Sequence, residues 1–84
     1  MGSDMVFDKI WGFPSERIRE YLEERGAETG SGVYSCAGCE VTVEALPDRR
    51  IGNIFLPQTR VRMEGPGAEA FHHEFLLRFL SGGG

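Results

Sequence analysis

The chain has 84 residues, of which 26% are charged, and a formal net charge of -4 at pH 7. A chain of this length buries only about 60–65% of the surface that its unfolded form exposes, which allows one domain with one modest core. The acidic balance argues against proteins that hold nucleic acid by phosphate neutralisation, and no apolar run approaches the roughly 18–20 residues of a membrane span. We therefore expect residues 1–84 to form a single cytoplasmic domain, with residues 1–4 as a disordered start or a cloning scar.

Two helices are predicted in the first third of the chain. Residues 6–12 favour a short N-terminal helix, because their apolar side chains recur at helical spacing: Val6, Phe7, Ile10 and Trp11. A second helix is expected from Pro14 to Arg25, since proline and Glu16 suit a first helical turn and Gly26 suits a helix end. Its buried face carries three apolar side chains: Ile18, Tyr21 and Leu22.

A β-hairpin is predicted over residues 33–45, after a flexible connection at residues 27–32. Two stretches, residues 33–36 and 39–45, alternate apolar with polar side chains on either side of a two-residue Ala-Gly turn. Such a turn places Cys36 opposite Cys39.

A third strand is predicted over residues 59–64, where Val61 and Met63 alternate with polar residues. The preceding Pro-Asp-Arg-Arg stretch, residues 47–50, is expected to turn the chain outward. Residues 51–57 are compatible with either a short edge strand or a hydrophobic loop that covers the core, because a Gly-Asn pair and a proline interrupt their apolar run.

The third strand also carries Arg60 and Arg62 on its other face. If this strand pairs antiparallel to the second one, both arginines lie across from Glu40 and Glu44. Such cross-strand pairs contribute about 0.2–1 kcal/mol each. We therefore expect the arginines to complement their own sheet rather than bind phosphate.

The last helix is predicted from the Gly-Pro-Gly stretch at residues 65–67 to Leu80. Its side chains form a broad apolar arc: Phe71, Phe75, Leu76, Phe79 and Leu80. The expected fold is thus α+β, with the order α-β-β-β-α and a short extra helix in front. A three-stranded antiparallel sheet with both helices packed on one face leaves the charged face to water.

This element order resembles that of double-stranded-RNA-binding domains. Such domains carry a lysine-rich start of the last helix, where this chain has acidic, aromatic and histidine residues instead: Glu69, Phe71, His72 and Glu74. The likeness therefore extends to the element order alone.

Cys36 and Cys39 have three interpretations. The pair could contribute to a zinc site, which needs four ligands, with His72 as the third; the adjacent His73 points about 100° away on a helix. It could form a thiol–disulfide centre, although a hairpin offers no helix dipole to lower a thiol pKa. The interpretation that we favour makes both cysteines small apolar core residues.

His72 falls within the apolar arc of the last helix and should face inward. We favour a neutral, hydrogen-bonded core histidine over a proton carrier or a metal ligand. Catalysis by a Cys-His pair would need an orienting group and an oxyanion pocket, and the sequence identifies neither, so no catalytic residue is assigned.

Residues 82–84 are three glycines, which we interpret as a flexible tail. The run resembles the tail of sulfur-carrier and ubiquitin-like proteins, whose final diglycine is activated by adenylation. That resemblance implies a β-grasp fold in which the tail follows a strand. Here the tail follows a predicted helix, so we rank the carrier role below the other interpretations.

The leading functional hypothesis is a non-enzymatic binding or accessory module. The apolar helix surface exceeds what one small sheet covers, which predicts an unknown protein partner or a homodimer contacted through Phe55, Leu56 and Leu77. The alternatives are a metal-binding or thiol-redox protein that uses Cys36, Cys39 and, for a metal, His72, and an RNA-binding module.

Overall fold

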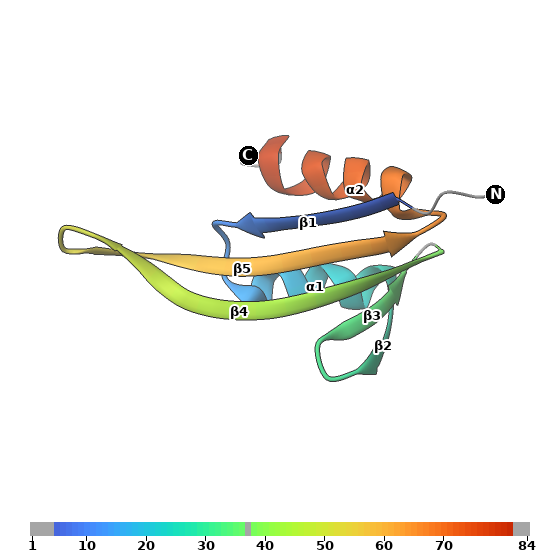
Figure 1. Ribbon diagram of the computed structural model, residues 1–84, viewed down its shortest axis with the longest axis horizontal. Helices are drawn as coiled ribbons and strands as arrows, with labels where there is room; N and C mark the ends of the chain where they lie inside the picture. Colours follow the sequence, from blue (N-terminus) through green and yellow to red (C-terminus); the bar gives the residue numbers. More distant parts are fainter. Residues whose placement is uncertain (1–4, 37, 82–84) are drawn as a thin grey trace.

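The computed structural model describes residues 5–36 and 38–81, so the predictions for residues 1–4, Ala37 and 82–84 lie outside the described residues. The elements follow one another in this order (Figure 1): β1 Met5–Trp11, α1 Ser15–Arg25, β2 Gly26–Gly30, β3 Val33–Cys36, β4 Cys39–Ile51, β5 Ile54–Gly65, α2 Ala68–Leu76 and the π-helical turn η1 Leu77–Ser81.

The sheet has five strands in the order β1-β5-β4-β3-β2, and every pair is antiparallel. The prediction of a three-stranded sheet with the order α-β-β-β-α is therefore wrong. The predicted flexible connection at residues 27–32 largely forms β2, which pairs with β3. The three predicted strands are present as β3, β4 and β5, and Cys36 lies opposite Cys39 as expected.

The segment before α1 is a strand rather than the expected short helix. Its apolar residues suit both structures: Phe7 and Trp11 lie on the helix-covered side of the sheet, whereas Val6 and Ile10 are exposed on the other. A helix this short is marginal by itself in water. Pairing with β5 along the whole length of β1 instead satisfies its backbone groups, and this long-range contact decides the structure.

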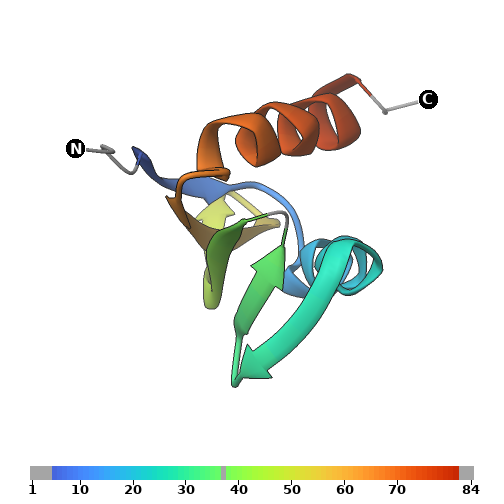
Figure 2. The same ribbon diagram turned by 90° about the vertical axis from the view of Figure 1, so that its right-hand side faces the viewer.

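Both helices cover the same face of the sheet (Figure 2), as the sequence predicts. They also contact each other: the ring of Tyr21 on α1 lies 6.0 Å from that of Phe71 and 5.6 Å from that of Phe79. An ion pair joins Arg25 to Glu74. The sheet contributes the predicted inward residues to the core: Cys36, Cys39, Val41, Val43, Val61 and Met63.

The opposite face of the sheet is charged, and its arginines pair within the sheet, but not with the predicted glutamates. Arg62 lies opposite Thr42 and not opposite Glu40, which faces Glu64. Arg60 makes two hydrogen bonds to Asp8, of 2.8 and 2.6 Å, and Arg62 lies 3.7 Å from Glu64. The principal partner of Arg60 is thus on β1, although Glu44 lies opposite it on β4. The hydrogen bonds from Arg60 hold the pKa of Asp8 below its usual value.

Phe75 is fully buried and should be the most sensitive ring of the core. Its centroid lies 4.8 Å from that of Trp11 and 4.5 Å from that of Phe79. We expect Phe75→Ala to lower the free energy of unfolding by about 3–5 kcal/mol in urea titrations. Leu80→Ala, at a residue that is 64% exposed, is the matched control and should change it by less than about 0.5 kcal/mol. Equal losses in both variants would contradict this packing.

Candidate functional site

The most prominent surface feature is the outer end of the β4–β5 hairpin. The pairing of β1 with β5 ends at Trp11↔Thr59, so residues 47–58 continue as a two-stranded ribbon, which we call the arm. It projects from the body along the long axis of the molecule (Figure 1). The expected outward turn at residues 47–50 is wrong, because the register shifts between Leu46 and Arg49 and the strand then continues.

The residues that the sequence left open, 51–57, contain the tip of the arm. Ile51 ends β4, and β5 begins at Ile54 after a tight turn in which Gly52 adopts a φ of +62°. Only glycine adopts such a conformation without strain, which explains the Gly-Asn pair here. The apolar run therefore forms a ribbon instead of covering the core.

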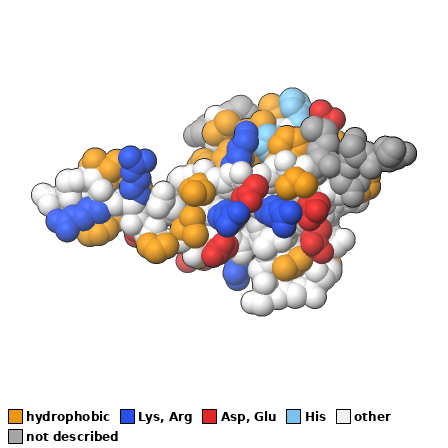
Figure 3. All heavy atoms as spheres, viewed as in Figure 1, with side chains coloured by type: hydrophobic (Ala, Val, Ile, Leu, Met, Phe, Trp, Pro, Cys, Tyr) orange, Lys and Arg blue, Asp and Glu red, His pale blue; other side chains and the backbone are white. Residues whose placement is uncertain are grey.

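The arm exposes apolar and basic side chains together. Ile54 and Phe55 are each 62% exposed, and Arg49 and Arg50 are exposed beside them. In Figure 3 the arm, at the left, is mostly basic and apolar, whereas acidic and basic side chains alternate across the middle of the molecule. Two of the three predicted interface residues, Phe55 and Leu56, are exposed on the arm; the third, Leu77, is exposed on η1.

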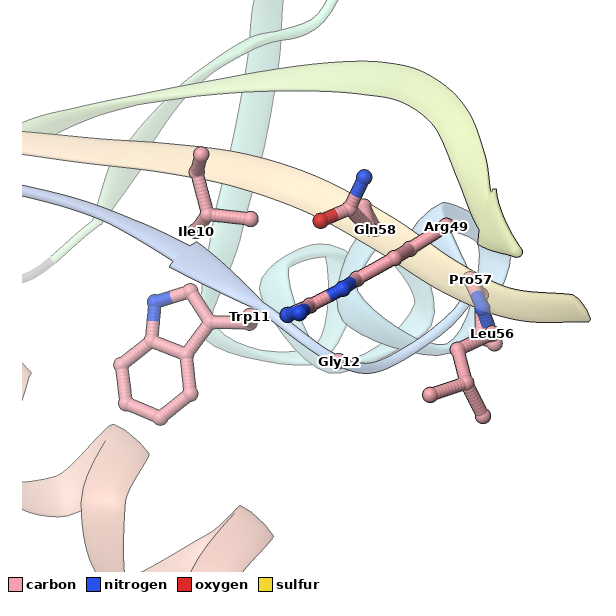
Figure 4. A pocket seen from close by; sticks show the side chains of 7 residues that line it. All are labelled: Ile10, Trp11, Gly12, Arg49, Leu56, Pro57 and Gln58. Carbon is pink, nitrogen blue, oxygen red and sulfur yellow. The ribbon is translucent and has the colours of Figure 1, made fainter. Parts of the chain in front are cut away.

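A shallow groove of about 360 Å³ lies at the root of the arm (Figure 4). One end of β1 and both strands of the arm line it: Ile10, Trp11, Gly12, Arg49, Leu56, Pro57 and Gln58. The side chain of Arg49 extends along the groove toward Trp11. Sequence reasoning missed this groove because it predicted a helix for residues 6–12, which cannot lie alongside β5.

The predicted metal or redox residues are not gathered into one site. His72 stacks on Phe7 of β1, with ring centroids 4.2 Å apart, whereas Cys36 lies on β3 and donates a hydrogen bond of 3.7 Å to the carbonyl of Leu22. In the sheet, β5 and β4 lie between β1 and β3. The three interstrand spacings of about 4.8 Å each therefore place β1 about 14 Å from β3. Among residues 5–36 and 38–81, no cluster of three or more His, Cys, Asp or Glu is suited to hold a metal ion.

Both thiols are buried, and burial sets their chemistry. It raises the pKa of Cys36, and it raises the pKa of Cys39 to about 11, with a further contribution from Cys36. At neutral pH both side chains are therefore protonated, whereas a thiol centre needs thiolate. This geometry supports the interpretation of the pair as small apolar core residues.

His72 is only 9% exposed and lies flat against Phe7. Burial is the main cause that lowers its pKa, and the nearby positive charge of Lys9 acts in the same direction. The ring is therefore neutral at pH 7, as expected. Its Nε2 atom has no hydrogen-bond partner among the described residues, so stacking takes the place of the hydrogen bond that we predicted.

Buried, protonated thiols should react slowly. The rise in the pKa of Cys39 from 9.0 to about 11 lowers its thiolate fraction about a hundredfold. We expect a colorimetric thiol reagent near pH 8 to modify Cys39 at least about a hundredfold more slowly in the folded protein than in urea, where both thiols are free. The variant Cys36→Ala isolates Cys39. A folded rate equal to the rate in urea would show that the thiol is accessible.

The neutral state of His72 predicts a pH dependence of stability. The folded protein binds this proton more weakly than the unfolded chain, so stability is complete above 6.5 and declines as the pH falls below that value. The variant His72→Phe should reduce the decline in Tm between about pH 7.5 and pH 5 relative to the unmodified chain. His73→Gln, at the exposed neighbour, should retain the full decline, and equal profiles for all three proteins would contradict the assignment.

No described helix meets the length and hydropathy needed to cross a membrane, and a search of curated proteins finds no match. A family model described as "Archaeal MoaD-like protein" matches residues 8–84. The predicted helix before the glycine run is present as α2 and η1. Because of this helix, the resemblance to sulfur carriers ranked low from the sequence alone, and the family match shows that this ranking was wrong. A MoaD-like protein is not itself a catalyst, so the expectation of a non-enzymatic protein is confirmed, and the chain belongs to the archaeal MoaD-like protein family.

Proposed function

We propose that this chain is a sulfur carrier or protein modifier that reacts through the carboxylate at the end of its glycine run. The observation that carries the proposal is the family match over residues 8–84, which includes Gly82-Gly83-Gly84. The proposal reverses our ranking from the sequence alone. Its protein partner is an activating enzyme, which supplies the catalytic groups.

The proposed chemistry takes place on the glycine carboxylate. One carboxylate oxygen attacks the α-phosphorus of a nucleoside triphosphate bound to the activating enzyme, and pyrophosphate leaves. Sulfide then attacks the acyl carbon and displaces the nucleoside monophosphate, which leaves a thiocarboxylate; in modification, an amine of another protein attacks instead and an amide forms. Because the nucleoside triphosphate is an intracellular substrate, this proposal retains the cytoplasmic location expected from the sequence.

The glycine run suits this role because it has no side chains. A tail without Cβ atoms passes through a narrow channel and lets the backbone approach the nucleotide closely. The run follows η1, in which Phe79 is buried with its ring centroid 5.1 Å from that of Phe13. An anchored aromatic residue close before the run gives the activating enzyme a defined starting point for the tail.

The neutral, buried side chains of the body also support a carrier whose catalytic groups come from the activating enzyme. The thiols and His72 are held in the core in protonated or neutral form, so they neither compete for the activated carboxylate nor attack it. The body then serves as the surface that the enzyme recognises.

The proposal is tested by pyrophosphate exchange into ATP, catalysed by an activating enzyme for MoaD-like proteins in the presence of a chain that ends at Gly84. We expect exchange with this chain and none after deletion of Gly83 and Gly84, because the reacting carboxylate is then displaced from the nucleotide. Gly30→Ala is the matched control, since a Cβ there meets no atom within 4 Å, and it should exchange normally. Equal exchange with and without the two glycines would refute the proposal.

A further inference from the structure

The arm, residues 47–58, is not explained by the carrier chemistry. A two-stranded ribbon by itself is marginally stable in water. This one nevertheless exposes more than half of the surface of Ile51, Ile54 and Phe55. An exposed apolar patch on a projecting element indicates a contact with another molecule.

Each face of the arm combines apolar side chains with a cation. Strand alternation and the pairs Arg49↔Leu56 and Ile51↔Ile54 place these four residues on one face. Arg50 and Phe55 share the other face, where the guanidinium lies 5.7 Å from the ring centroid and donates a hydrogen bond of 2.9 Å to Gly52. Within the described part of the chain, no ion pair joins Arg49 or Arg50 to a carboxylate.

Helix α1 carries an excess of the opposite charge, with four glutamates against three arginines. Glu16, Glu20 and Glu24 follow one another at a spacing of four residues, and all three are exposed. Like charges at this spacing destabilise a helix. The described ion pairs do not relieve them, because Arg25 at the end of α1 pairs with Glu74 on α2 instead.

These two surfaces complement each other but are separated within one molecule. The arm extends beyond the body in Figure 1, whereas α1 packs under the middle of the sheet. An arm can therefore reach such a helix in a second copy. The arm holds two arginines against one aspartate, so the acidic excess lies entirely on the rest of the chain.

We propose that two copies of this chain form a closed dimer in which the arm of each copy docks on α1 of the other. The face of the arm that carries Arg49, Ile51 and Ile54 then lies against α1, so that Arg49 meets the glutamates and the two isoleucines are covered at the contact. The two-fold arrangement uses both arms and both helices, so it closes without leaving an arm free to recruit a third copy. This association is independent of the glycine run and of its activation.

The test is a charge reversal measured by light scattering and sedimentation. We expect a dimer at about 0.05 M salt that weakens at about 0.5 M salt, because salt screens the arginine–glutamate attraction. The variants Arg49→Glu and Glu20→Arg/Glu24→Arg should each raise the dimer dissociation constant at least about tenfold, a difference of about 1.4 kcal/mol. Mixed in equal amounts, the two variants should restore association, because both arm–helix contacts of the mixed dimer then join opposite charges again.

The controls separate this contact from general loss of structure. Ile54→Ser should weaken the dimer, whereas Leu80→Ser, at an exposed apolar residue of η1, should leave it unchanged. Circular dichroism of each variant verifies that it is folded. A strict monomer at low salt and high concentration overturns the proposal, as does a dimer that is insensitive to the arm substitutions or a failure of the mixed variants to associate.

Discussion

The antiparallel pairing of β4 with β5 places every other part of this protein. It runs from Glu40↔Glu64 in the body to Ile51↔Ile54 at the tip of the arm. Within the body, alternation along these two strands directs valines and a methionine toward the helices and charged residues toward water. Beyond the body no third strand accompanies the pair, so the same ladder becomes an exposed arm.

The core explains why the reactive residue types of this chain have no catalytic role. Aromatic rings from α1, β1 and η1 surround Phe75, and the same packing buries His72 and both cysteines. Burial disfavours the charged forms, and the pKa shifts of all three groups follow that rule. The burial of both thiols and of His72 fits a protein whose proposed reactive group is the carboxylate of its tail.

The surface of the body divides into two kinds of charge. On the sheet, arginines and carboxylates pair with each other, as Arg60 does with Asp8. Among the residues that the structure describes, no ion pair engages Arg49 and Arg50 of the arm or Glu16, Glu20 and Glu24 of α1, and these two groups have opposite signs. Surface charges that are left unpaired in this way contribute more to the choice of a partner and to the rate of encounter than to the stability of the fold.

Local pattern by itself determined the elements whose partners are close in sequence. Helix α1, the last helix, the β3–β4 hairpin with Cys36 opposite Cys39, and the inward residues of β4 and β5 all follow from periodicity and turn chemistry. The tertiary structure alone decided β1, because Phe7 and Trp11 suit a helix and a strand equally and only pairing with β5, some fifty residues later, selects the strand. The groove and the separation of His72 from the thiols depend on that same pairing. The arm likewise required the register shift near Leu46, since two prolines and a Gly-Asn pair interrupt the local pattern that would otherwise predict a long hairpin.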